Sequence, residues 1–222
     1  MQEHNHQNAA AGFHGLGIAP IILEALGRLG YTVPTPIQFK AIPIAIEGKD
    51  LVGIAQTGTG KTLAFGIPMI QRLARGLPAQ AGNGEGLVVL PTRELALQVD
   101  EAFRKLGARL GLKTAVLIGG ASMRPQMQAL RNMPHVIIAT PGRLLDHLSQ
   151  KTCRLDAMTV AVFDEADRML DMGFAPQIQK ILHALPSERQ TMLFSATMPP
   201  EIMKMAALHL KLPVRVEIAP SG

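Results

Sequence analysis

The stretch "AQTGTGKT", residues 55–62, decides how the surrounding chain folds. It follows the largely apolar run "DLVGI" and precedes "LAFGIPMIQRLA", a run typical of a helix. Gly58 and Gly60 allow the backbone to turn its N–H groups inward, and the following helix directs the positive end of its dipole toward the loop. A buried strand, a glycine-rich loop ending in Lys-Thr and a helix form the phosphate-cradling P-loop arrangement. The stretch therefore predicts a nucleoside triphosphate site.

The side chains of this loop predict how a nucleotide is held. Lys61 would reach the β- and γ-phosphates, and the hydroxyl of Thr62 would bind Mg²⁺. The motif begins with Ala55 where the general pattern has glycine, and a small residue satisfies that position. An ordinary strand-to-helix turn with a chance Lys-Thr pair is the alternative. The predicted nucleotide-binding residues of the loop are Thr57, Gly58, Thr59, Gly60, Lys61 and Thr62.

The rest of the chain repeats this alternation of buried strands and helices. Near-continuous apolar runs occur at "GLVVLP", "KTAVLI", "HVIIAT", "TVAVFDE" and "QTMLFSA", as in strands buried on both faces of a parallel sheet. Between them, segments such as "RELALQVDEAFRKLGARLG" carry apolar residues three and four positions apart. The pattern predicts an α/β fold, a doubly wound and mainly parallel sheet with helices on both faces. We expect a mobile polar tail over residues 1–12 and one domain over residues 13–218.

An acidic cluster follows one of the predicted strands. "VAVFDEAD" ends in Asp164, Glu165 and Asp167, and ligands of doubly wound sheets bind at the carboxyl ends of strands. Asp164 is predicted to hold Mg²⁺, and Glu165 to orient or deprotonate an attacking water. The alternative is a helix start made acidic to suit the helix dipole.

Composition narrows the class of protein further. The chain has 222 residues, 47% of them hydrophobic, and a net charge of +5, which is compatible with a polyanionic partner but does not require one. A single cysteine, Cys153, excludes an internal disulfide and a cysteine-rich zinc site, so we expect a packed thiol. No apolar run approaches the roughly 20 residues that span a bilayer. These features favour a cytoplasmic protein without a membrane segment.

Several short motifs together resemble a known family. The chain is similar to the DEAD-box ATP-dependent RNA helicases, whose motifs occur here in the family's order, each at or just after a predicted strand. The resemblance implies the amino-terminal RecA-like lobe of such an enzyme, with ATP and Mg²⁺ as cofactors. Residues 168–174 and 185–199 also look like the bacterial branch of the family. The motifs are "AQTGTGKT" at 55–62, "PTREL" at 91–95, "GG" at 119–120, "TPGR" at 140–143, "DEAD" at 164–167 and "SAT" at 195–197.

Upstream, "GYTVPTPIQ" at 30–38 looks like the family's adenine-reading Q motif. The resemblance implies that Gln38 hydrogen-bonds adenine and that Phe13 stacks on it, which selects ATP over GTP. A bidentate amide and an aromatic face are also physically suited to reading an adenine edge. Without the resemblance, Phe13 would be assigned to hydrophobic packing and Gln38 to a helix surface.

The resemblance assigns the remaining motifs to RNA and to coupling. Arginine, threonine hydroxyls and glycine N–H groups bind phosphate without reading bases, which agrees with contacts to the RNA backbone. An ordinary helix start at "TPGR", with Thr140 as cap, is compatible with that role. Asp167, Ser195 and Thr197 are expected to couple hydrolysis to strand separation. The predicted RNA contacts are Pro91, Thr92, Arg93, Gly119, Gly120, Thr140, Pro141, Gly142 and Arg143.

The resemblance covers residues 13 to about 218 and only half of the family's architecture. Family members continue into a second lobe that supplies arginines to the γ-phosphate, and residues 219–222 correspond to the start of the linker to it. We expect the lobe alone to be a monomer that hydrolyses ATP poorly. Two alternatives stay open: a non-catalytic nucleotide- or RNA-binding module, and a P-loop ATPase that acts on a partner other than nucleic acid.

Overall fold

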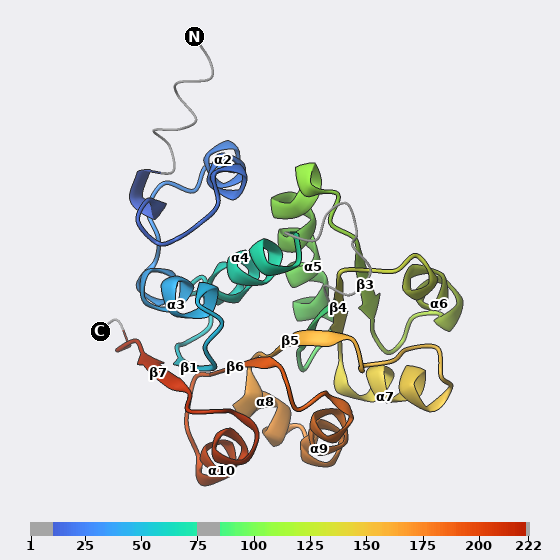
Figure 1. Ribbon diagram of the computed structural model, residues 1–222. Coiled ribbons are helices and arrows are strands. Elements are labelled where there is room, and N and C mark those ends of the chain that lie inside the picture. Colours follow the sequence, from blue (N-terminus) through green and yellow to red (C-terminus); the bar gives the residue numbers. More distant parts are fainter. Residues whose placement is uncertain (1–10, 75–84, 221–222) are drawn as a thin grey trace.

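The fold is described from a computed structural model, which defines residues 11–74 and 85–220 (Figure 1). Seven strands form one sheet in the order β3-β4-β2-β5-β6-β1-β7, and every neighbouring pair runs parallel. The predicted doubly wound α/β fold is confirmed. The strands are β1 (Leu51–Ile54), β2 (Glu85–Val89), β3 (Thr114–Leu117), β4 (Val136–Ala139), β5 (Met158–Phe163), β6 (Gln190–Ser195) and β7 (Val214–Glu217).

The strands are linked by helices, as parallel pairing requires. Most of these helices begin where the sequence offers a start signal, such as the proline at or beside the first helical position of α2, α3, α7, α9 and α10. The helices are α2 (Pro20–Arg28), α3 (Pro36–Ile46), α4 (Lys61–Ala74), α5 (Arg93–Gly107), α6 (Met123–Arg131), α7 (Pro141–Ser149), α8 (Ala166–Asp171), α9 (Ala175–Ala184) and α10 (Pro200–His209), with the 3-10 turns η1 (Ala11–Phe13) and η2 (Ala108–Leu110).

Helices pack on both faces of the sheet, so the core has two layers. The side chains of each strand alternate between them: on β4, Ile138 packs with the cluster under α3, α4 and α5, and Ile137 packs with the cluster under α7, α9 and α10. Figure 1 shows these two groups of helices on opposite sides of the sheet. Since both faces are covered, the central strands read as continuous apolar runs.

The apolar runs do not predict β7, the strand at the edge of the sheet next to β1. Its sequence is "VRVE", in which Arg215 and Glu217 are exposed and Val216 is buried. A strand buried on one side only alternates polar and apolar residues, and four residues are too few to make that alternation distinctive. The predicted sheet was therefore one strand too small.

The predictions for the amino-terminal tail, for Cys153 and for membrane-spanning segments can also be compared with the structure. Residues 1–10 of the predicted tail lie outside the described residues, while Ala11 and Gly12 belong to η1. Cys153 is 5% exposed, and burial, helped by the charge of Glu85, raises the pKa of its thiol to about 12. The packed thiol is therefore confirmed. In the described part of the chain, no helix has the length and apolar character needed to cross a bilayer.

Candidate functional site

Except for Phe13 on η1 and Gln38 on α3, the predicted site residues lie at or just after the carboxyl ends of parallel strands, and these strand ends form one edge of the sheet. The order of strands divides this edge in two. The neighbours β3, β4 and β2 are followed by the predicted RNA motifs, and the neighbours β5, β6 and β1 by the acidic, SAT and P-loop motifs. Segments far apart in sequence thus form two adjacent groups, one on each half of the sheet.

The P-loop connects β1 to α4, which begins at Lys61, two residues before the predicted helical run "LAFGIPMIQRLA". Gly58 and Gly60 have φ angles of 85° and 82°, a region that side chains rarely adopt. A Cβ on Gly60 would also lie 2.5 Å from the Gln38 amide nitrogen. Thr57 and Gly58 are exposed, whereas Lys61 is buried at the base of the loop. The turn therefore requires glycine at both positions, and the close contact with α3 is a second requirement at Gly60.

Lys61 joins the P-loop to the acidic cluster. Its Nζ lies 3.1 Å from Asp164 Oδ1 and 4.0 Å from Glu165 Oε1, although these residues are far apart in sequence. Burial raises the pKa of Asp164, and repulsion by Glu165 adds to the rise, while the charge and hydrogen bond of Lys61 oppose it. The lysine therefore partly offsets the cost of a buried carboxylate.

Glu165 lies beside both Lys61 and the P-loop. Its Oε1 accepts a hydrogen bond from Thr57 Oγ1 at 3.2 Å, and its Oε2 accepts one from Arg168 at 3.5 Å. The residue is 7% exposed and has a φ of 52°, in the left-handed region. Such backbone strain persists only where neighbouring contacts impose it, and it occurs often at functional sites.

Asp167 is linked to the SAT motif by three hydrogen bonds. Its Oδ2 accepts from the Thr197 hydroxyl at 2.9 Å and from the Thr197 N–H at 3.1 Å, and its N–H donates to Ser195 Oγ at 3.2 Å. Burial raises the pKa of Asp167, but these hydrogen bonds and the Arg168 N–H outweigh it, so the net pKa is lowered. The role of these contacts in coupling stays a prediction.

The variant Thr197→Val tests that hydrogen bond. Because valine cannot donate, the pKa of Asp167 is expected to rise toward its usual range. An acid with a lowered folded pKa stabilises the fold above its unfolded pKa of about 3.9 and loses this effect as pH falls through the folded pKa. In the variant this stabilisation should be smaller, and its loss on acidification should be complete at a higher pH. The measurement is a carboxyl ¹³C NMR titration, with Thr159→Val as the distant control, and an Asp167 titration identical to wild type would contradict the assignment.

The Q-motif residues are occupied by contacts within the protein. Gln38 is 3% exposed; its Oε1 accepts from the Thr35 N–H at 2.9 Å and its Nε2 donates to the Gly60 carbonyl at 3.0 Å. Phe13 is completely buried in the core. Stacking of Phe13 on adenine therefore requires the segment before α2 to move, while Gln38 already links α3 to the P-loop. Tyr31, 41% exposed in the same motif, is an aromatic that the sequence analysis did not single out.

Some of the predicted RNA-binding residues are exposed, and others are buried or engaged in contacts within the protein. Gly119, Gly120, Arg93 and Gly142 are exposed, and the Arg93 guanidinium would lie 3.6 Å from a Cβ on Gly120. Other members serve the fold: Thr92 Oγ1 accepts from the Leu95 N–H at 3.3 Å as the cap of α5, Thr140 and Pro141 start α7, and Pro91 is buried.

Arg143 is the clearest difference from the expected arrangement. Its side chain is 13% exposed, and its Nη1 donates to the Ala121 carbonyl at 2.8 Å and to Gln126 Oε1 at 3.3 Å. Gln126 in turn contacts His147. Gln126 and His147 are buried polar residues that the sequence motifs do not reveal. The feature of the sequence that could have indicated them is a polar side chain at a core-facing position of a helix.

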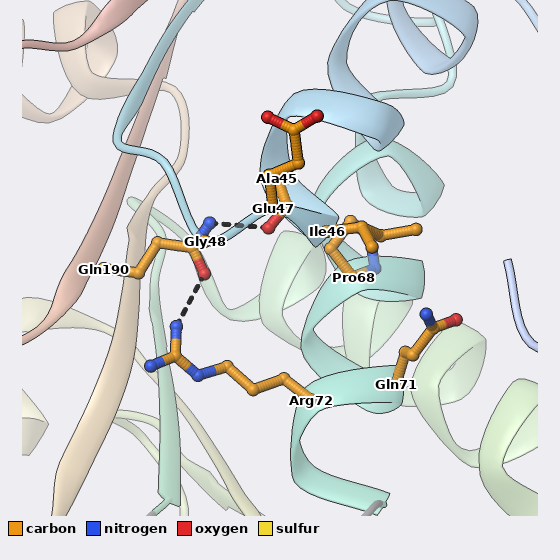
Figure 2. A pocket seen from close by; sticks show the side chains of 8 residues that line it. All are labelled: Ala45, Ile46, Glu47, Gly48, Pro68, Gln71, Arg72 and Gln190. Carbon is orange, nitrogen blue, oxygen red and sulfur yellow. Dashed lines mark hydrogen bonds between the residues drawn. The ribbon is translucent and has the colours of Figure 1, made fainter. Parts of the chain in front are cut away.

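A separate cavity of about 300 Å³ lies away from this edge. Figure 2 shows it between the end of α3, the middle of α4 and Gln190, the first residue of β6. Arg72 donates to Gln190 Oε1 at 3.0 Å, and Gln190 Nε2 donates to the Ala45 carbonyl at 2.8 Å. Since Gln190 begins its strand, the cavity lies at the opposite end of the sheet from the P-loop.

Comparison with known proteins agrees with this geometry. The model of the DEAD/DEAH box helicase family matches residues 35–205. The ATP-dependent rRNA helicase RRP3 of Debaryomyces hansenii is 48% identical over 208 residues, which cover 93% of this chain and 43% of that protein. The corresponding protein of Sclerotinia sclerotiorum is 46% identical over 214 residues, covering 96% and 44%. The chain thus spans less than half the length of these curated relatives.

Solved structures resemble the chain over a similar extent. A DEAD box protein from Methanococcus jannaschii matches with a TM-score of 0.85 and 38% identity, covering 93% of this chain and 55% of that one. A hypothetical ATP-dependent RNA helicase from Sulfolobus tokodaii matches with a TM-score of 0.81 and 37% identity, covering 89% and 56%. The resemblance to bacterial members stays a prediction, because these relatives are fungal and archaeal. The match to the family model over residues 35–205 includes every predicted site residue except Phe13.

Proposed function

Because the chain belongs to the DEAD/DEAH box helicase family, we propose that it is the nucleotide- and RNA-binding lobe of an ATP-dependent RNA helicase. With a second lobe, it would couple ATP hydrolysis to local unwinding of RNA duplexes. The observation that carries the proposal is the contact of 3.1 Å between Lys61 of the P-loop and Asp164 of the DEAD motif. Two motifs far apart in sequence meet at the point where a γ-phosphate and its metal must be bound.

The nucleotide site would form by an exchange of partners. Lys61 would exchange Asp164 for the γ-phosphate of ATP as its main partner, and the N–H groups of the P-loop would bind the other phosphates. Thr57, Gly58, Thr59 and Gly60 would form this cradle, whose turn depends on the positive φ angles of its two glycines. Asp164, once free of Lys61, becomes available to a cation.

Mg²⁺ fits the same site. In the described residues, no group of three or more His, Cys, Asp or Glu side chains is placed to hold a metal ion. Mg²⁺ commonly binds one or two protein ligands together with substrate phosphates and water, so Thr62 and Asp164 would suffice when ATP is bound. The ion would neutralise charge on the β- and γ-phosphates. Glu165 would orient or deprotonate the attacking water.

RNA and adenine contacts would use the exposed parts of the edge. The exposed residues Arg93, Gly119, Gly120 and Gly142 would contact the RNA backbone, and the half-buried Thr92 and Thr140 at the starts of α5 and α7 would contact it beside them. The buried guanidinium favours a supporting role for Arg143 over a direct phosphate contact. Gln38 and Phe13 would read adenine after local rearrangement, and Asp167, Ser195 and Thr197 would couple the two halves of the edge.

The first test is steady-state ATP hydrolysis by this chain at saturating Mg²⁺, with and without single-stranded RNA. We expect weak ATP binding and turnover near background that RNA does not raise, because an arginine finger from a second lobe is worth roughly 10³ to 10⁵ in rate in related NTPases. Adding the second lobe should restore RNA-stimulated turnover. A chain that binds neither ATP nor RNA, or a two-lobe protein whose turnover ignores RNA, would overturn the proposal.

A further inference from the structure

The two loops that begin α6 and α7 are tied together by a chain of side-chain hydrogen bonds. The first loop contains Gly119 and Gly120 and follows β3; the second is Thr140 to Arg143 and follows β4. Since β3 and β4 are neighbours in the sheet, the loops emerge side by side. Contact between neighbouring loops is expected, but a buried polar connection between them needs a reason, because buried polar groups are costly unless fully paired.

Arg143 makes the first link of this connection. Its Nη1 donates both to the Ala121 carbonyl, directly after the two glycines, and to Gln126 Oε1 on α6. Its Nε lies 3.5 Å from Asp146 Oδ2 on the same helix. The guanidinium therefore fixes the backbone that follows Gly120 relative to the start of α7.

Gln126 makes the second link and is 6% exposed. Its Nε2 donates to the Ile118 carbonyl at 2.9 Å, on the other side of the two glycines from Ala121. Its Oε1 faces both Arg143 and His147 Nε2, the latter at 2.9 Å. The amide and Arg143 thus hold the backbone on both sides of Gly119 and Gly120.

His147 makes the third link and is completely buried. A guanidinium only donates, so the amide atom facing Arg143 is the oxygen, and His147 must donate to it from Nε2. Nδ1 lies 2.8 Å from Thr152 Oγ1, whose single hydroxyl proton can be donated either to Nδ1 or to the His147 carbonyl at 3.1 Å; with the ring neutral and protonated on Nε2, it is donated to Nδ1. Burial lowers the pKa of His147, and the positive charge of Arg143 lowers it further, while the negative charge of Asp146 opposes the shift. A lowered pKa agrees with a neutral ring protonated on Nε2.

We propose that His147 is a positioning residue for RNA binding, which acts through Gln126 to hold the Gly119–Gly120 loop and the Thr140–Arg143 loop in one arrangement. This inference rests on the proposed RNA-binding function. Without the Nε2–H donor, Gln126 Oε1 keeps only the longer hydrogen bond from Arg143, at 3.3 Å, so the amide is held less firmly between the two loops. The loops then sample more conformations, and RNA has to order them when it binds.

The experiment compares His147→Leu, His147→Gln and wild type in the intact chain. The RNA probe is a fluorescein-labelled single-stranded oligouridine at low salt, followed by anisotropy. Loss of one hydrogen-bonded link predicts RNA affinity reduced by about three- to tenfold in His147→Leu. Glutamine can supply an N–H near the position of Nε2, so His147→Gln should recover most of the affinity. Affinity for a fluorescent ADP should stay unchanged in both variants.

Two further readouts separate positioning from general loss of structure. Amide hydrogen exchange at residues 118–121 should be faster in His147→Leu, while exchange in β1 and β5 is unchanged. If His147→Leu does not fold, Gln126→Met takes its place in the test. This variant keeps the histidine but removes the amide, and it should show the same loss of RNA affinity.

The outcomes distinguish this inference from the proposed function. Wild-type protein that does not bind the RNA probe overturns the proposed function itself. Wild-type binding together with equal binding by His147→Leu and Gln126→Met overturns the positioning role alone. The same holds if His147→Gln loses as much affinity as His147→Leu, because the N–H donor would then not be the feature that matters.

Discussion

Replacing Lys61 by alanine is expected to weaken binding of ATP by about a hundredfold or more. Lys61 is the buried cation at the base of the P-loop, and charge-assisted hydrogen bonds to phosphate contribute about 1.5–3 kcal/mol each. About 1.4 kcal/mol corresponds to a factor of ten in affinity. Loss of the contacts of Lys61 with the phosphates therefore lowers the affinity for ATP by about a hundredfold or more. The measurement is calorimetric titration with ATP and Mg²⁺. The matched control is Lys49→Ala, which removes an exposed lysine paired with Glu47 at 2.9 Å.

The same variant should also destabilise the ligand-free protein. Removing one partner of a buried ion pair costs about 3–5 kcal/mol, because Asp164 is left without compensation. The pKa of Asp164 is already raised, and loss of Lys61 raises it further. An acid with a raised folded pKa loses stability as pH rises through that pKa. Thermal unfolding should therefore show a smaller loss at pH 5 than at pH 8; a loss independent of pH, or ATP affinity close to wild type, would contradict this account.

Glu165→Gln is expected to stop hydrolysis while leaving nucleotide binding nearly intact. The amide keeps an oxygen that can accept from Thr57, so the P-loop contact at 3.2 Å can persist. It cannot take a proton from water, and loss of a general base typically lowers the rate by about 10²–10⁴. Affinity for ATP should stay within about threefold of wild type, since Glu165 makes no predicted contact with the phosphates.

The rate is best measured as single-turnover ATP hydrolysis, with saturating RNA, in a two-lobe protein that contains this chain. Glu201→Gln, an exposed acid in the first turn of α10, is the matched control. Turnover equal to wild type in Glu165→Gln would remove Glu165 from the mechanism. A parallel loss of ATP affinity would instead show that its main role is to hold the P-loop.

The sequence predicted most of the fold because the central strands are buried on both faces. Six strands appear as runs of Val, Ile, Leu and Phe, and parallel pairing then requires the helical connections between them. The same logic predicted that Lys61 and Asp164 lie at one edge, since both follow carboxyl ends of strands. The edge strand β7 could not be predicted in this way, because only Val216 packs firmly into the core.

The side-chain contacts of the site were less predictable. Gln38, Arg143 and His147 each make a side-chain hydrogen bond to a residue on a different helix or loop, 21 or 22 positions away in the sequence. The periodicity of apolar residues indicates which face of a helix or strand is buried, but it does not indicate which polar group a buried side chain will contact. Motif comparison assigned Arg143 to RNA because its residue type suits phosphate. Only the folded arrangement shows that its guanidinium is already bonded to the neighbouring loop.

The order of the strands also determines when this protein can fold during its synthesis. β1, which leads into the P-loop, pairs only with β6 and β7, the last two strands of this sheet in chain order. At about 5–20 residues per second, roughly ten seconds or more separate β1 from its partners. Throughout that time an apolar strand has both of its backbone edges unpaired, and such edges invite aggregation. The nucleotide-binding half of the sheet therefore forms last, and its assembly depends on how well the nascent chain is protected.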